Sequence, residues 1–169
     1  YMRSRNSFNK KLASNPLFEG VKVITADVPP SNAFTEPESQ DLVVTFRNLH
    51  NWLGGDSMKA VMQEAYNSLK PGGFFGVVEH RAPEGSSMEF MKKSGYVTQS
   101  LAIKKALEVG FELVRTSEIN ANPNDTANHP RGVWTLPPSF RLKDKDRAKY
   151  ELIGESDRMT LLFKKSLLN

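Results

Sequence analysis

The chain of 169 residues contains no cysteine. Disulfides, thiolate metal sites and cysteine nucleophiles are therefore excluded. The sequence also lacks any apolar run near the roughly 18 residues that a membrane-spanning helix needs. Its first residues, YMRSRNSFNKKLAS, contain no apolar stretch of a signal peptide and do not begin with methionine. We interpret them as the interior of a longer protein, with a cytoplasmic location as the default and an exported location as the alternative.

The sequence also has no large excess of charge of one sign. The formal net charge is +4, from 23 basic and 19 acidic side chains, which is weak evidence for a nucleic-acid partner. The segment RLKDKDRAK at 141–149 interleaves both signs and is typical of a solvated surface. We expect a single domain over residues 1–169 that binds a small molecule and no nucleic acid. A homo-oligomer stays open.

Strand patterns alternate with helix patterns along the chain. Runs of β-branched and apolar residues predict strands at 21–28, 41–46, 74–80, 111–119 and 158–164. Apolar residues three and four apart predict helices at 4–14, 56–69 and 96–109. The alternation indicates an α/β fold with a mainly parallel sheet and helices on both of its faces.

Polar side chains follow two of these strands at the point where each strand ends. DLVVTF leads into Arg47, Asn48, His50 and Trp52, whereas FFGVVEH ends in His80 and leads into Arg81. In open α/β sheets, ligands bind beyond the carboxyl ends of the strands. We therefore predict the functional site at this edge of the sheet.

Several short motifs occur in a fixed order, namely ITAD, RNLHNW, LKPGG, EHRA, NPND and a final DR followed by LLFKK. In this order they resemble class I S-adenosylmethionine-dependent methyltransferases, and most closely a group of uncharacterised bacterial methyltransferases. The resemblance spans nearly the whole chain. It implies a Rossmann-like sheet, mostly parallel with an antiparallel last strand, and S-adenosyl-L-methionine as the cofactor.

One hallmark of that family is missing. Its members open with a strand, a glycine-rich loop of the G-x-G-x-G kind and a helix, and no such loop occurs in this sequence. If the family order holds, two βα units on the order of 60 residues precede the chain. Either the sequence is an N-terminally incomplete part of a longer protein, or it cannot hold the cofactor in the usual way. We favour the incomplete chain.

The resemblance assigns cofactor contacts to two strand ends. Asp27 would accept a hydrogen bond from the adenine amino group, and Val28 would pack on the ring. Phe46, Arg47 and Asn48 would line the methionine part. For Asp27, the alternative is a loop-capping carboxylate before two prolines.

Two histidines are the candidate catalytic residues. His50 is a candidate base, because imidazole titrates near neutral pH, although it equally fits a loop residue that satisfies backbone groups. His80 would form a two-imidazole corner with it. We expect no metal, since no third ligand is evident at a suitable spacing. Trp52 and Arg81 are candidates for substrate binding, with core packing and a surface salt bridge as their respective alternatives.

The favoured function is methyl transfer from S-adenosylmethionine to a small-molecule acceptor. One alternative is a catalytically inactive methyltransferase-like module for binding or assembly, which the missing glycine loop motivates. Another is a nucleotide-binding oxidoreductase, which would need a dinucleotide fingerprint that the chain also lacks. The Asn- and Pro-rich segment 120–140, with His129 and Trp134, is either a lid or a surface loop.

Overall fold

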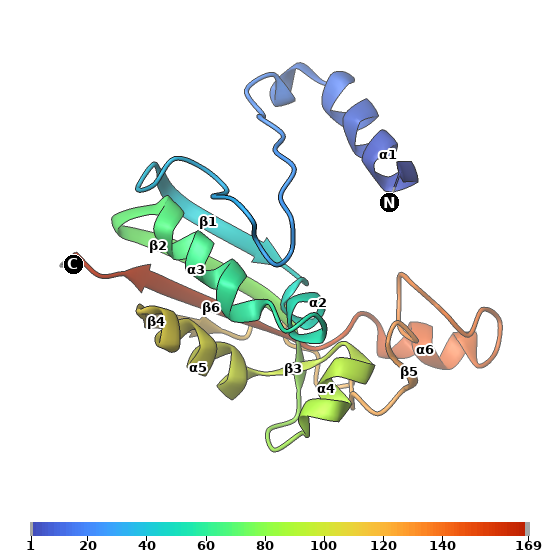
Figure 1. Ribbon diagram of the computed structural model, residues 1–169. Helices are drawn as coiled ribbons and strands as arrows, with labels where there is room; N and C mark the ends of the chain where they lie inside the picture. Colours follow the sequence, from blue (N-terminus) through green and yellow to red (C-terminus); the bar gives the residue numbers. More distant parts are fainter. Residues whose placement is uncertain (1, 168–169) are drawn as a thin grey trace.

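The computed structural model describes residues 2–167, with the side chains of residues 2–4 left aside. Its centre is a sheet of five strands (Figure 1), in which four follow the order β1-β2-β6-β4 and β3 pairs with β2. The strands are β1 (Gln40–Phe46), β2 (Leu69–Ala82), β3 (Val97–Thr98), β4 (Phe111–Ser117) and β6 (Arg158–Lys165).

Strand direction follows the expected pattern. β1 and β3 run parallel to β2, whereas β6 lies between β2 and β4 and is antiparallel to both. β4 therefore runs parallel to β2, and the last strand is the antiparallel one. The prediction of a Rossmann-like, mostly parallel sheet with an antiparallel last strand is confirmed.

Two long helices pack together on one face of this sheet. They are α3 (Met58–Ser68) and α5 (Gln99–Val109), and both match helices expected from apolar spacing. Beneath them lie the inward-facing residues of β2 and β6, where Phe75, Val77, Leu161 and Phe163 are at most 1% exposed. Burying a side chain of this kind contributes roughly 1.5–3 kcal/mol, so this face holds most of the core.

The opposite face of the sheet is open within residues 2–167. Leu42, Val44 and Phe46 of β1 are 51–60% exposed, because alternate strand residues point to opposite faces. No described helix has its main contacts there. The second helical layer that the sequence led us to expect is thus not formed by these residues.

The predicted strand at 21–28 is not present, which corrects the sequence analysis. Residues 21–28 are extended but unpaired, and every one of them is exposed. A strand is stable only where a neighbour takes its backbone hydrogen bonds, and none of the described strands lies beside this segment. Figure 1 shows it crossing to α1 (Met2–Ala13), which lies apart from the sheet.

Shorter elements complete the chain. The sequence analysis did not anticipate η1 (Pro16–Phe18), α2 (Leu49–Gly54), α4 (Met88–Ser94), β5 (Pro130–Val133) and α6 (Arg147–Ile153). Each spans at most two turns of helix or four residues of strand, so hydrophobic periodicity is too brief to reveal it. Among the described residues, no helix combines the length and apolar character that crossing a bilayer demands.

Candidate functional site

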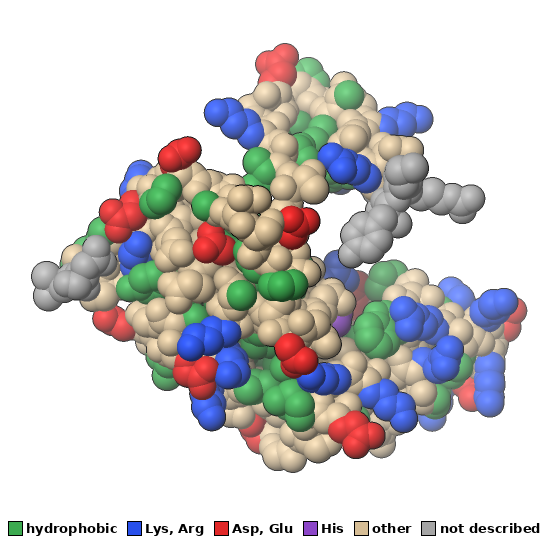
Figure 2. Space-filling model, viewed as in Figure 1, with side chains coloured by type: hydrophobic (Ala, Val, Ile, Leu, Met, Phe, Trp, Pro, Cys, Tyr) green, Lys and Arg blue, Asp and Glu red, His purple; other side chains and the backbone are tan. Residues whose placement is uncertain are grey.

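A cavity of about 730 Å³ lies at the carboxyl ends of β1 and β2. Its walls come from these strand ends, from β6, and from the end of β5 and the segment after it. The lining residues are Phe46, Arg47, Asn48, His50, His80, Val133, Trp134, Pro137, Pro138, Ser139 and Arg158. Figure 2 shows the hollow, with purple histidine atoms inside it. The volume falls within the range of small-molecule sites.

A buried carboxylate lies beneath His50. Glu79 has no exposed surface, and its Oε1 is 3.0 Å from Nδ1 of His50. The same carboxylate accepts the backbone N–H of His50 at 3.2 Å and that of His80 at 2.8 Å. These three donors offset the cost of burying a charge. Glu79 therefore fixes both the position and the orientation of the His50 ring.

His80 forms the next part of the wall. Its Nδ1 lies 2.5 Å from the hydroxyl of Ser156, and its ring centroid is 5.5 Å from that of His50. Burial is the main cause, helped by cationic neighbours, of a fall in the pKa of His80 from 6.5 to about 3. The His80 imidazole is accordingly neutral at ordinary pH.

Three groups that can ligate a metal come together here. One ligand atom each from His50, Glu79 and His80 lies within 4.8 Å of the others. The sequence analysis found no third ligand beside the two histidines, but the fold supplies Glu79. Nδ1 of His50 and Oε1 of Glu79 are hydrogen-bonded to each other, so a cation bound through these two atoms would have to displace the proton between them.

A polar network holds the segment after β4 against this site. Asp125 accepts hydrogen bonds from the hydroxyl of Tyr96 at 2.9 and 3.1 Å and from the backbone N–H of Asp157 at 2.8 Å. His129 Nε2 lies 2.8 Å from the same carboxylate. Burial opposes ionisation, but the hydrogen bonds outweigh it and lower the pKa of Asp125. The network fixes the start of the segment that carries Trp134.

Comparison with known proteins gives a consistent answer. A profile of the methyltransferase domain matches residues 3–77. No curated relative matches the sequence. Several solved structures, however, resemble the fold of this chain. One is an S-adenosylmethionine-dependent methyltransferase from Methanosarcina mazei, which is 14% identical with a TM-score of 0.55. The match covers 94% of this chain and 76% of that protein. Residues 3–77 thus match the methyltransferase domain, and the chain shares the fold of these methyltransferases.

Two further structures share this methyltransferase fold. The [4+2]-cyclase SpnF is 14% identical with a TM-score of 0.62, over 96% of this chain and 61% of its own. A candidate sarcosine dimethylglycine methyltransferase from Galdieria sulphuraria is 18% identical with a TM-score of 0.60, over 97% and 65% respectively. The chain therefore spans less than two thirds of the length of these two proteins.

The methyltransferase fold brings the residues predicted at the end of β1 together. Phe46, Arg47 and Asn48 all line the 730 Å³ cavity beside His50. Arg47 has a positive φ of 58° and its N–H donates to the carbonyl of Val78 at 2.7 Å, so the chain turns sharply as it leaves the strand.

Asp27 and Val28 lie away from this group. Both are exposed on the unpaired segment, where Asp27 accepts a hydrogen bond from the hydroxyl of Ser31 at 2.5 Å. Neither residue lines the cavity.

Trp52 and Arg81 do not line the cavity either. Trp52 packs against the core, and Arg81 forms ion pairs with Asp157 at 2.9 Å and Glu118 at 2.6 Å. These acidic partners raise the pKa of Arg81 above its usual value. Both residues thus form the contacts that their alternatives describe, and a role in substrate binding stays a prediction.

The sequence analysis did not predict three neighbours of the histidines as site residues. Tyr96, Asp125 and Ser156 reach His80 or its support from positions 16 to 76 residues away along the chain. Only Asp125 carried a signal, through its place in the motif NPND. The other two are ordinary residues whose role depends on packing.

Proposed function

We propose that this chain is part of an S-adenosylmethionine-dependent methyltransferase that acts on a small-molecule acceptor, with His50 as the base that takes the acceptor's proton. The observation that carries the proposal is the hydrogen bond between the buried Glu79 carboxylate and Nδ1 of His50. It occurs at the wall of a cavity in a methyltransferase fold.

The hydrogen bond determines where the base has its lone pair. An ionised carboxylate only accepts hydrogen bonds, so Nδ1 of His50 carries the hydrogen between them. A neutral imidazole then has its lone pair on Nε2. When Nε2 takes a proton, the negative charge of Glu79 stabilises the imidazolium, as in other paired bases. His80, whose pKa is near 3, does not compete for that proton.

The residues present fit part of the cofactor. Phe46, Arg47 and Asn48 would hold its methionine end at the cavity wall. Asp27 lies outside this cavity and accepts a hydrogen bond from Ser31, and its carboxylate would accept a further hydrogen bond from the adenine amino group. When bound, S-adenosylmethionine supplies a methyl group that its sulfonium charge already activates. The protein then has to align the acceptor and take its proton.

The cofactor assignment is tested by calorimetric titration with S-adenosylhomocysteine. We expect saturable one-to-one binding, either to this chain or to a version extended at its N-terminus by the natural sequence. Absence of binding at both lengths would favour the inactive binding module instead.

The role of His50 is tested by the substitution His50→Gln in whichever version binds. For an acceptor that loses a proton, we expect kcat to fall roughly 10²–10⁴-fold with S-adenosylhomocysteine affinity unchanged. An unchanged kcat would remove His50 from the chemistry. Addition of a divalent cation and of a chelator in parallel assays separates this role from metal ligation by His50, Glu79 and His80.

A further inference from the structure

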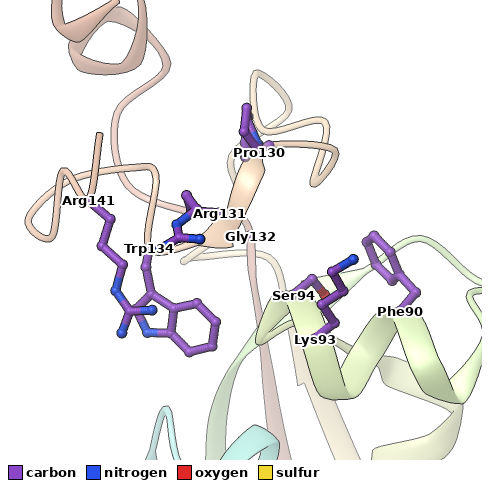
Figure 3. A pocket seen from close by; sticks show the side chains of 9 residues that line it. Phe90, Lys93, Ser94, Pro130, Arg131, Gly132, Trp134 and Arg141 are labelled. Carbon is purple, nitrogen blue, oxygen red and sulfur yellow. The ribbon is translucent and has the colours of Figure 1, made fainter. Parts of the chain in front are cut away.

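A second cavity of about 410 Å³ lies next to the first, between α4 and the segment that begins with β5. Figure 3 shows its two sides, with Phe90, Lys93 and Ser94 on α4 facing residues of the β5 segment. The lining residues are Phe90, Lys93, Ser94, His129, Pro130, Arg131, Gly132, Trp134 and Arg141. Nothing in the proposed methyl transfer uses this cavity.

The cavity concentrates positive charge without acidic partners. Lys93, Arg131 and Arg141 line it, and no aspartate or glutamate does. Among the described residues, none of these three side chains forms an ion pair or a hydrogen bond. The adjacent Lys92 shows the usual contrast, since it pairs with Asp56 at 2.6 Å. Unpaired cations around one hollow attract an anion.

Aromatic rings form the remaining walls. Phe90 stands on α4, and across the cavity the guanidinium of Arg141 lies 4.5 Å from the centroid of the Trp134 ring. Stacking of this kind holds a guanidinium in place while its N–H groups stay available at the rim. The site therefore suits a ligand with both an anionic group and a flat apolar part.

Trp134 connects this cavity to the candidate active site. It lines both cavities, and its ring lies 5.9 Å from that of His50 in an edge-to-face arrangement. A ligand whose anionic group is held by Lys93, Arg131 and Arg141 would extend along Trp134 toward the base.

The backbone makes the arrangement rigid. Gly132 has a φ of +58°, and a Cβ there would lie 2.1 Å from the carbonyl oxygen of Ser94, so β5 presses directly on α4. The N–H of Arg131 donates to the hydroxyl of Thr135 at 3.0 Å. These contacts hold the Arg131 backbone at the cavity wall.

We propose that the second cavity binds the anionic group of the methyl acceptor, a carboxylate or a phosphate carried on a small planar organic molecule. That this molecule is a methyl acceptor rests on the proposed function, whereas the anion site rests on the cavity alone. Three unpaired cations, two aromatic walls and the shared Trp134 all point to the same class of ligand.

Calorimetric titration of the full chain with benzoate and with phenyl phosphate tests the proposal, with neutral benzamide as the matched control. We expect saturable binding of at least one anion, which identifies the preferred group, and much weaker binding of benzamide. Lys93→Gln and Arg131→Gln should each weaken the anion roughly tenfold or more. Lys145→Gln removes the same charge from an exposed position outside the cavity and should leave the affinity unchanged.

Equal affinity for benzamide, equal loss in Lys145→Gln, or no saturable binding of either anion would overturn the proposal. Circular dichroism of each variant identifies loss of fold. Among the described residues, the side chain of Lys93 forms no hydrogen bond or ion pair and is exposed, so its variant keeps the test interpretable. The titration needs neither cofactor nor methyl transfer. Its failure is therefore distinguishable from failure to bind S-adenosylhomocysteine.

Discussion

Nδ1 of His50 lies 3.0 Å from Oε1 of Glu79, although 29 positions separate the two residues in the chain. α2 carries the histidine and β2 carries the glutamate, which is completely buried. The pair therefore exists only because the end of β1 and the end of β2 lie side by side in a parallel sheet.

Replacing Glu79 with glutamine removes the negative charge. It also places an amide N–H₂ among the groups of His50 and His80 that donate hydrogen bonds to the carboxylate. We expect the free energy of unfolding to fall by about 1–3 kcal/mol, because a buried donor loses its acceptor. Glu89→Gln, at an exposed position of α4, is the control and should stay within about 0.5 kcal/mol of the parent. Urea denaturation gives both values, and ¹⁵N shifts of His50 should show a loss of the Nδ1–H form. A variant with unchanged tautomer and stability would contradict the assigned hydrogen bond.

Stability should fall in mild acid because of His80. Its pKa is 6.5 when unfolded and about 3 when folded, so the unfolded chain binds the extra proton between these values. The contribution is fully present above pH 6.5 and is lost as the pH falls toward 3, with a slope of up to about 1.4 kcal/mol per pH unit.

Denaturation midpoints at several pH values measure this effect. His80→Asn should flatten the dependence, since asparagine does not titrate. The parent protein and the variant would show the same acid slope if another group, such as Asp125 with its lowered pKa, dominated instead.

Gly132 and Gly85 offer a matched pair of glycines. Both have positive φ, but a Cβ at Gly85 meets nothing within 4 Å, whereas one at Gly132 would meet the backbone of Ser94 at 2.1 Å. Gly85→Ala should cost about 1–2 kcal/mol from backbone strain alone. Gly132→Ala should lower the free energy of unfolding by more than about 3 kcal/mol, because the added Cβ would force β5 to move away from α4. Thermal unfolding compares them, and equal losses would show that β5 and α4 are not in close contact.

The open face of the sheet is tested with two valines. Val44 is 51% exposed on that face, and Val77 is 1% exposed beneath the helices. Val77→Thr should destabilise by about 1–3 kcal/mol because it buries a hydroxyl, and Val44→Thr by less than about 0.5 kcal/mol. A large loss at Val44 would mean that a further segment or a second copy covers this face in solution.

The sequence by itself determined the periodic parts of this protein. The apolar spacing of Met58, Val61, Met62 and Ala65 leads to α3, and the continuous runs at 41–46 and 74–80 lead to β1 and β2. Such patterns are reliable because burial of one helix face or of a strand is a local property of the residues. The placement of polar residues at the strand ends followed from the same patterns.

Tertiary structure decided whatever required a partner from elsewhere in the chain. Residues 21–28 have strand composition yet form no strand, because no described neighbour accepts their hydrogen bonds. Strand alternation places Glu79 and His80 on opposite faces, but His50 follows the end of β1 and approaches both. Trp134 comes from a segment without regular periodicity and reaches His50 only through folding. The site exists because folding buries some of these residues and brings together others that are far apart in the sequence. Local sequence patterns contain no information about either effect.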